Sequence, residues 1–254
     1  MALTFTGGVR LQQGSFKASI TPIPFLVNAV NFDGTNDYLL RGGALTGLAA
    51  GKQVTFSFWV KIGLDETTMW LHDSAAGRAT ILKGSDNLLN ITFQTSTGST
   101  VWTGTSTNTI TISSGWTHIL ISLNSETGGR KLYINDSLET IVSEVFNSDA
   151  IIDLVETNWS VGAHPAGILK YNGDMAEFYF TNEFIDLSIE ANRRKFIDAS
   201  LKPVDLGSDG SIPTGTAAIV YFNNPTVTWH TNKGTGGGYT EVGALTTATT
   251  SPSD

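Results

Sequence analysis

The chain has 254 residues, of which 40% are hydrophobic and 15% are charged, and its formal net charge is −8. This acidic balance argues against nucleic acid and anionic membranes as partners, because the only run of basic residues is 193–195. Since the chain has no cysteine, it cannot form disulfides, thiolate metal sites or a cysteine nucleophile.

Residues 1–27 are punctuated by Gly and Pro and carry apolar side chains at irregular spacing. The segment lacks the continuous apolar stretch and small-residue cleavage site of a signal peptide, and no part of the chain reaches the ~20 apolar residues of a membrane span. We expect an extended N-terminal arm that docks on another protein or on a second copy of the chain. Packing of the arm on its own domain is an equal alternative.

Alternation of apolar and polar residues predicts short antiparallel strands after the arm. In the clearest of them, residues 54–62 (VTFSFWVKI), Phe56 and Phe58 lie on one apolar face and Trp59 lies on the opposite, polar face. The same alternation marks residues 89–94, 109–112, 116–123, 132–134, 176–180 and 219–222. The residues expected at the centre of the core are Phe56, Phe58, Val60, Ile119, Ile121 and Phe178. Together with many Gly, Thr and Ser residues, this pattern favours an all-β sandwich or barrel.

One short helix is predicted near residues 187–199, with Ser188 as its N-cap and Pro203 beyond its end. Ile189, Phe196 and Ile197 fall on one helical face. The basic run 193–195 is then interpreted as a solvated face near the negative end of the helix dipole. The last segment, residues 231–254, is rich in Gly, Thr and Ser and is expected to be a loop-like extension.

Six motifs, taken in order, resemble the laminin-G-like, concanavalin A-like jelly-roll family. They are VNFDGTNDYLL (30–40), VTFSFWVKI (54–62), GWTHILISLN (115–124), RKLYIND (130–136), WSVGA (159–163) and YNGDMAEFYFTN (171–182). The resemblance implies an antiparallel jelly-roll β-sandwich over residues 28–230, with the arm 1–27 before it and the extension 231–254 after it.

Many members of that family bind calcium at the rim of the sandwich, so Asp33, Asp37 and Asp174 are the calcium candidates that the resemblance implies. Ala176 stands where the family often has Asp, and Asp174 is displaced from that position by two residues. Asp and Asn next to Gly are also typical of a tight turn. We therefore interpret the NFDGTNDYLL segment as a strand, turn and strand and expect no cofactor, with calcium as the alternative.

Glycoside hydrolases share this fold and need two carboxylates ~5–9.5 Å apart. Asp174 and Glu177 are three residues apart, so on a regular strand they point to opposite faces. The chain has no G-x-S-x-G motif, and its four histidines show no metal-ligand spacing. We therefore expect no catalytic residues and no enzymatic activity.

A binding surface is the better prediction, because sugar rings stack on aromatic side chains. The candidates expected in loops are Trp70, with His72 and Asp73 beside it, and Trp102. The alternative is that these tryptophans are partly buried anchors or lie in a subunit interface.

The long form of the domain and its Gly-rich end resemble proteins encoded in phage and prophage genomes. This resemblance implies a non-enzymatic structural protein of a tailed-bacteriophage virion, such as a head decoration, fibre or tail-associated protein, that is assembled in the host cytoplasm. Residues 1–27 are expected to contact other virion proteins or copies of the chain, and the sandwich is expected to bind a cell-surface glycan. The alternatives are a bacterial surface or secreted adhesion module and a degenerate glycoside hydrolase.

Overall fold

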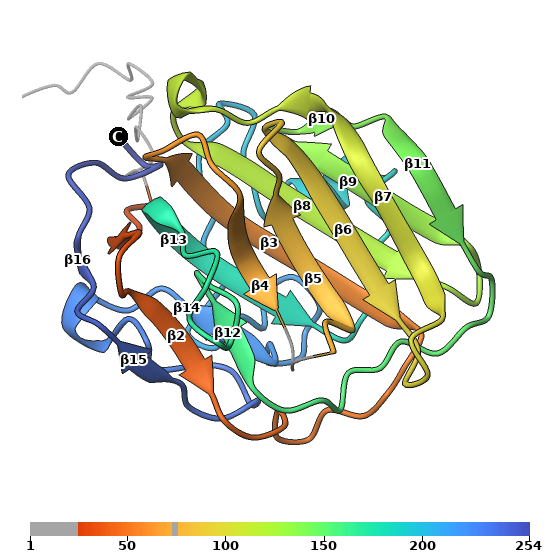
Figure 1. Ribbon diagram of the computed structural model, residues 1–254. Helices are drawn as coiled ribbons and strands as arrows, with labels where there is room; N and C mark the ends of the chain where they lie inside the picture. Colours follow the sequence, from red (N-terminus) through yellow and green to blue (C-terminus); the bar gives the residue numbers. More distant parts are fainter. Residues whose placement is uncertain (1–24, 73–75) are drawn as a thin grey trace, which may run out of the picture.

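Two antiparallel eight-stranded sheets face each other in a sandwich, as the alternating strands predict (Figure 1). The computed structural model describes residues 25–72 and 76–254. Sheet A contains, in spatial order, β10 (Ser137–Leu138), β9 (Gly129–Ile134), β8 (Thr117–Asn124), β3 (Gln53–Ile62), β13 (Asn172–Thr181), β1 (Ala29–Asp33) and β16 (Thr246–Thr247), with β14 (Val220–Phe222) paired to β13. Sheet B contains β11 (Ile141–Phe146), β7 (Thr100–Thr109), β6 (Leu88–Gln94), β5 (Ala79–Lys83), β4 (Thr68–His72), β12 (Trp159–Val161), β2 (Tyr38–Arg41) and β15 (Thr240–Val242). The described residues also form two 3-10 turns, η1 (Ile112–Ser114) and η2 (Thr226–Thr228), and one α-helix, α1 (Glu190–Arg193).

Aromatic side chains from the inner faces of β3 and β13 form the centre of the core. Phe56 stacks on Phe180 with 4.4 Å between ring centroids, and Phe58 stacks on Phe178 at 5.5 Å. The residues expected in the core are all fully buried, namely Phe56, Phe58, Val60, Ile119, Ile121 and Phe178. Each such side chain contributes ~1.5–3 kcal/mol of hydrophobic stabilisation. The register predicted from alternation is therefore confirmed.

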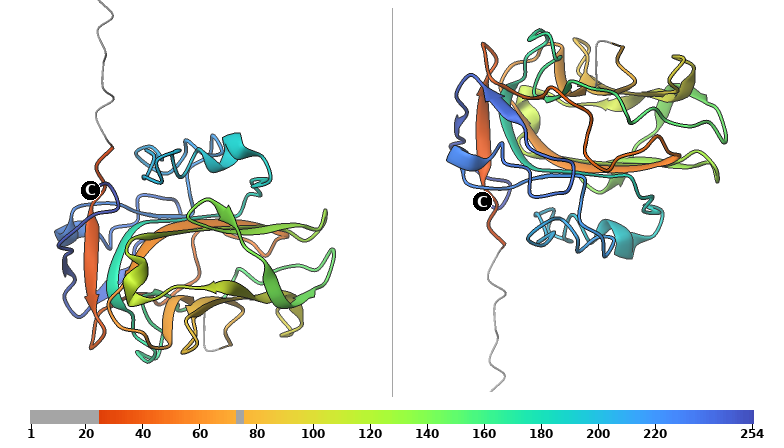
Figure 2. Two further views of the ribbon diagram at one scale, coloured as in Figure 1. Left: turned by 90° about the horizontal axis from the view of Figure 1, so that it is seen from above. Right: turned by 90° about the horizontal axis from the view of Figure 1, so that it is seen from below.

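The outer face of sheet A is buried as well, so the expectation that β3 has a solvated face is wrong. Trp59 is 2% exposed and its ring lies 4.7 Å from that of His118. The segment between β13 and β14, which includes α1, forms a third layer over this face (Figure 2). Leu187 and Phe196 of this layer pack with Tyr179 of β13 in a second apolar cluster. Alternation within one strand cannot reveal a layer that a distant segment contributes.

The helix is shorter than the predicted 187–199 and begins differently. Ile189, not Ser188, is the N-cap of the single turn α1. Ser188 instead donates its N–H and hydroxyl to the carboxylate of Asp186, which holds the preceding turn. Phe196 and Ile197 are buried as expected, but Ile189 is 51% exposed, because the helix ends before a long apolar face can form.

The basic run 193–195 connects the outer layer to the β9–β10 hairpin and is not a solvated helix face. Arg193 Nε lies 2.6 Å from one oxygen of Asp136, and Arg194 Nη2 lies 2.7 Å from the other. The guanidinium of Arg193 also lies over the ring of Tyr133. Because a single carboxylate in the hairpin pairs with both arginines, the short helix is fixed in place despite its length.

Residues 231–254 are part of the sandwich and not an extension. They supply β15, which pairs with β2, and β16, which pairs with β1. Val27 at the start of the described chain is buried, and its N–H donates to the hydroxyl of Ser253 at 3.0 Å. Of the predicted arm, residues 1–24 lie outside the described residues, and its last residues pack beside the C-terminal segment.

A β-bulge in β13 overturns one expectation about acidic residues. The pairing of β13 with β3 shifts after Ala176, so that β13 carries one more residue than β3 before pairing resumes. Glu177 lies in this bulge with a φ of 48°, and its carboxylate accepts a hydrogen bond from the hydroxyl of Tyr221 at 3.0 Å. Asp174, beside Lys61, lies on the same outer face of sheet A, because it alternates with Ala176, which packs with Trp59 there. The prediction that Asp174 and Glu177 point to opposite faces is therefore wrong, because a bulge reverses the alternation.

Candidate functional site

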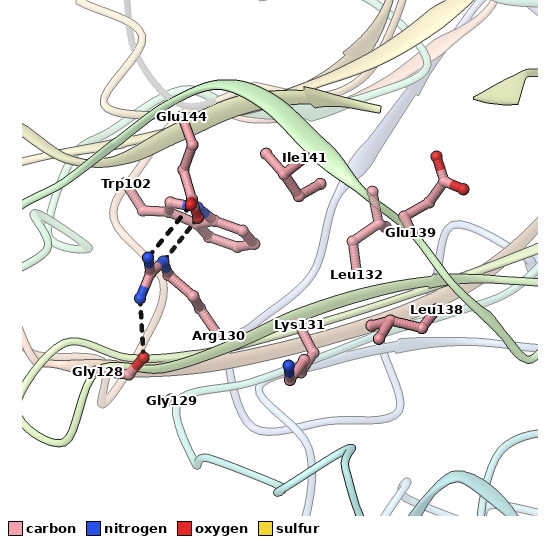
Figure 3. A pocket seen from close by; sticks show the side chains of 10 residues that line it. All are labelled: Trp102, Gly128, Gly129, Arg130, Lys131, Leu132, Leu138, Glu139, Ile141 and Glu144. Atoms are coloured by element: carbon pink, nitrogen blue, oxygen red, sulfur yellow. Dashed lines mark hydrogen bonds and ion pairs between the residues drawn. The ribbon is translucent and has the colours of Figure 1, made fainter. Parts of the chain in front are cut away.

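A pocket of about 330 Å³ opens at the side of the sandwich where edge strands β10 and β11 face each other (Figure 3). Its lining residues are Trp102, Gly128, Gly129, Arg130, Lys131, Leu132, Leu138, Glu139, Ile141 and Glu144. They come from β7 and β11 of sheet B, from β9 and β10 of sheet A, and from the connections that contain Gly128 and Glu139. The pocket therefore exists only because the two sheets are stacked, and we call it the edge pocket.

Arg130 of β9 and Glu144 of β11 form an ion pair across the gap between the sheets (Figure 3). Arg130 Nε donates to Glu144 Oε1 at 2.7 Å, and Nη2 donates to Oε2 at 3.2 Å. Nη1 donates to the carbonyl of Gly128 at 3.1 Å. The two side chains remain 27% and 31% exposed, so a ligand in the pocket can reach them.

Two aromatic residues hold this ion pair in place. The indole N–H of Trp102 donates to Glu144 Oε1 at 2.9 Å, and the guanidinium of Arg130 lies 4.0 Å above the centre of the Phe146 ring. The hydrogen bond from Arg130, assisted by that from Trp102, lowers the pKa of Glu144 below its ordinary value. Glu144 therefore stays ionised at neutral pH, and the pair is ordered before any ligand arrives.

The remaining wall of the pocket is apolar. Leu132, Leu138 and Ile141 lie between the two sheets, beside the charged pair (Figure 3). Leu132 follows Arg130 by two positions on β9, so both side chains lie on the inner face of the sheet. The side chain of Lys131, between them, points away from the Arg130–Glu144 pair (Figure 3).

The second carboxylate of the pocket has a structural role. Glu139 is 5% exposed and points away from the Arg130–Glu144 pair (Figure 3). Its Oε2 accepts the backbone N–H groups of Thr107 and Asn108 at 3.1 and 3.0 Å. A general acid needs a raised pKa, and a nucleophile needs free access to the substrate. The lowered pKa of Glu144 is the reverse of what a general acid needs, and the carboxylate of Glu139 is occupied by backbone N–H groups.

The tryptophans chosen from the sequence lie in strands, so their expected loop positions are wrong. Trp70 belongs to β4 and is fully buried in the core, where it cannot stack on a ligand. His72 ends the same strand, is 5% exposed and contacts the ring of His164. Asp73 lies outside the described residues. Only Trp102 reaches the edge pocket, and it acts there through its N–H and not through an exposed ring face.

The calcium candidates are engaged in hydrogen bonds. Asp33 accepts two backbone N–H groups of its own turn at 2.7 and 3.0 Å. Asp37 is 3% exposed and accepts the backbone N–H groups of Asp33 at 3.1 Å and Ala244 at 2.8 Å. Asp174 accepts the side-chain amide of Asn31 at 2.7 Å. Within residues 25–72 and 76–254, no three His, Cys, Asp or Glu residues gather as they do around a metal ion.

The two stacked antiparallel sheets are the jelly-roll architecture of lectin and laminin G domains. A sequence profile of the concanavalin A-like lectin/glucanases superfamily matches residues 33–185, which is more than half of the chain. The chain belongs to this family. A search of the curated proteins finds no match.

Solved structures share the fold at low sequence identity. A proposed carbohydrate-binding protein from Bacteroides ovatus is 12% identical, with 89% of this chain and 60% of that chain covered and a TM-score of 0.60. A heptameric SAP-like pentraxin from Limulus polyphemus is 14% identical, with 63% and 78% covered and a TM-score of 0.46. Domains LG4-5 of the mouse laminin alpha1 chain are 15% identical, with 71% and 49% covered and a TM-score of 0.44. The chain thus spans 60% of the Bacteroides protein.

Among the described residues, no helix has the length and apolar character needed to cross a bilayer.

Sequence reasoning missed Arg130 and Glu144, the two charged residues of the edge pocket. A signal for Arg130 was present, because it shares the alternation of Leu132 and Ile134 and is thus a charge on an inward-facing position. Glu144 gave no such signal, since it lies next to an irregularity in the pairing of β11 with β7.

Proposed function

We propose that this chain is a non-enzymatic carbohydrate-binding module and that the edge pocket is its sugar site. The observation that carries the proposal is the Arg130–Glu144 pair beside an apolar wall. A guanidinium has five N–H groups, and three of those on Arg130 are engaged by Glu144 and Gly128. The other two can donate to sugar hydroxyls, while Glu144 can accept from them. Leu138, which is 54% exposed, and Ile141 can cover the apolar face of the ring.

The size of the edge pocket supports the same assignment. Its volume of about 330 Å³ is near the lower end of ligand sites, ~300–1,000 Å³. We therefore propose that the site takes one or two sugar units of a longer glycan. The Bacteroides ovatus structure supports this assignment only through its fold.

The surroundings of the carboxylates support binding without catalysis. Arg130 keeps Glu144 ionised, and the carboxylate of Glu139 accepts hydrogen bonds from two backbone N–H groups. A panel of purified polysaccharides tests both halves of the proposal, with binding and release of reducing ends measured on the same samples. We expect saturable binding to at least one glycan and no product. Product release would favour the degenerate glycoside hydrolase.

We also propose that the module belongs to a tailed-bacteriophage virion, as a decoration, fibre or tail-associated protein anchored through residues 1–27. Support comes from the resemblance to phage-encoded proteins and from the apolar residues of the N-terminal segment. Mass spectrometry of purified particles from the source genome tests the location. A chain lacking residues 1–24 should keep its melting temperature and its glycan binding but leave the particle. Absence of the full chain from particles, with its presence on the bacterial surface, would favour the adhesion module.

A further inference from the structure

A second pocket, of about 560 Å³, lies between the β6–β7 hairpin and the segment that joins β11 to β12. Thr95 and Ser96 of the hairpin line it, together with Asp149, Ile151, Asp153 and Val155. None of these residues lines the edge pocket. We call it the hairpin pocket, and the carbohydrate proposal does not use it.

Asp153 is the most informative residue of the hairpin pocket. It is only 3% exposed, and its Oδ1 accepts the backbone N–H of Val155 at 3.2 Å. Its backbone N–H donates to the carbonyl of Gln94 at 2.8 Å, which fixes the residue against β6. Across residues 25–72 and 76–254, Asp153 Oδ2 accepts no hydrogen bond and Asp153 joins no ion pair. Asp153 Oδ2 therefore stays accessible from the pocket, where it can accept a hydrogen bond from a ligand.

The mouth of the pocket combines aliphatic surface with negative charge. Ile151 is 53% exposed and Val155 is 49% exposed, so both offer aliphatic surface at the mouth. Asp149 is 70% exposed in its side chain and pairs with Lys52 at 2.5 Å. The ammonium group of Lys52 is therefore an example, at the rim of the pocket, of a cation bound by this acidic surface.

These features select the chemistry of a ligand by exclusion. An anion is repelled by Asp149 and Asp153. A metal ion finds too few ligands, since no group of three His, Cys, Asp or Glu residues forms in the described part of the chain. A wholly apolar ligand would exclude water from Asp153 Oδ2 and give it no hydrogen-bond donor. Burying an acceptor without a partner would reduce the free energy of binding. The ligand must carry both an aliphatic body and a positively charged or donating tip.

A sugar and an arginine fit less well than a lysine. No aromatic ring or side-chain amide lines the hairpin pocket, so the groups that usually recognise a sugar are missing from its described wall. An arginine binds best to a carboxylate with two open oxygens, whereas Asp153 has one, because Val155 occupies the other. An ammonium is a point charge and needs only that single acceptor.

We propose that the hairpin pocket binds a lysine side chain presented by a partner protein, with the aliphatic stem on Ile151 and Val155 and the ammonium at Asp153. The net charge of −8 makes a basic partner the complementary one. Lys52 competes for the same negative rim, so its removal strengthens binding.

The test uses the full chain and a small probe, Nα-acetyl-lysine N-methylamide, in an NMR titration of methyl-labelled protein. The expected result is saturable shifts of the Ile151 and Val155 methyl signals. The norleucine analogue keeps the stem but lacks the charge, and it should bind at least tenfold more weakly. The arginine analogue should also be weaker. Equal binding of the norleucine analogue, or tighter binding of the arginine analogue, would overturn the assignment.

Three variants complete the test. Asp153→Asn keeps an oxygen for the Val155 N–H, so the fold is retained, and it should weaken the lysine probe at least tenfold. Lys52→Met should tighten binding severalfold. Glu190→Gln removes the same charge from the distant helix α1 and should leave binding unchanged. The proposal fails if Asp153→Asn binds like the native chain, if Glu190→Gln weakens binding as much, or if the native chain shows no saturable shifts.

Discussion

The guanidinium of Arg130 and the carboxylate of Glu144 join the two sheets of the sandwich through two contacts, at 2.7 and 3.2 Å. Arg130 lies on β9 of sheet A and Glu144 on β11 of sheet B. Trp102 holds Glu144 from a third strand. A site arranged in this way loses little conformational entropy on binding, and this preorganisation is why we place the sugar there.

The core makes a first prediction. Phe58→Ala should lower the free energy of unfolding by ~3–5 kcal/mol, because the fully buried ring packs on both Phe178 and Trp70. Urea unfolding followed by tryptophan fluorescence measures this change. Val142→Ala is the matched control, since that side chain is 42% exposed on an edge strand and its loss should cost less than ~0.5 kcal/mol. A cost below ~1 kcal/mol for Phe58→Ala would contradict the assigned packing.

Glu177 makes a prediction about pH. Burial raises its pKa to about 8 in the folded protein, above its ordinary value of 4.5. Between these values the folded state keeps a proton that the unfolded state has released. The free energy of unfolding should therefore fall as the pH rises through this window, by up to ~1.4 kcal/mol per pH unit from this residue.

Glu177→Gln removes this titration while keeping an acceptor for the Tyr221 hydroxyl. The variant should be more stable than the native chain at pH 8 and should show a flatter profile from pH 4.5 to 8. Urea unfolding at a series of pH values gives both curves, with the exposed-site variant Glu190→Gln as the control. Parallel profiles for the native chain and Glu177→Gln would show that Glu177 does not hold a proton in the fold.

His118 makes the opposite prediction at acidic pH. Burial lowers its pKa to about 3 from its ordinary value of 6.5, and its ring hydrogen-bonds Ser57 at 2.8 Å. Below pH 6.5 the imidazole of His118 is protonated in the unfolded state but stays neutral in the folded state. The stability that a neutral His118 provides is complete above that pH and is lost as the pH falls toward 3. His118→Gln should reduce the acid sensitivity seen in the native unfolding profile, and an unchanged acid limb would contradict this account.

The turn at Asp37 is expected to need no metal. Calcium should leave the melting temperature of the native chain unchanged, because Asp33 and Asp37 already accept backbone N–H groups. Asp37→Ala should destabilise the chain with or without calcium, by ~1–3 kcal/mol for each buried N–H that loses its acceptor. Thermal unfolding with and without calcium measures both effects. A rise of several degrees on adding calcium, abolished by Asp37→Ala, would establish a calcium site.

The sequence predicted what alternation within a strand can reveal. Phe56 and Phe58 were placed in the core because their period of two is local information. Trp59 was misplaced, because the residues that cover it, such as Val27 and Ile197, are distant in sequence. Glu177 was misplaced because a bulge changes the period without a signal in residue type.

The candidate site was less predictable for the same reason. Trp102 was chosen for an exposed ring, and the structure buries that ring and uses its N–H. The pairing of Arg130 with Glu144 depends on how the two sheets stack, which residue spacing along the chain does not encode. Non-local contacts therefore decide the chemistry of the edge pocket, while local patterns decide the strands that build it.

The most direct test of the central claim is the affinity of the edge pocket for the tightest glycan of the polysaccharide panel, measured by isothermal titration calorimetry. Arg130→Met removes the donor group inside the pocket, and Lys170→Met removes the same charge from a residue that does not line the pocket. We predict at least a tenfold loss of affinity for Arg130→Met and no change for Lys170→Met, with both variants folded by circular dichroism. Equal affinity of Arg130→Met and the native chain, or no binding to any glycan by the native chain, would contradict the assignment of the pocket.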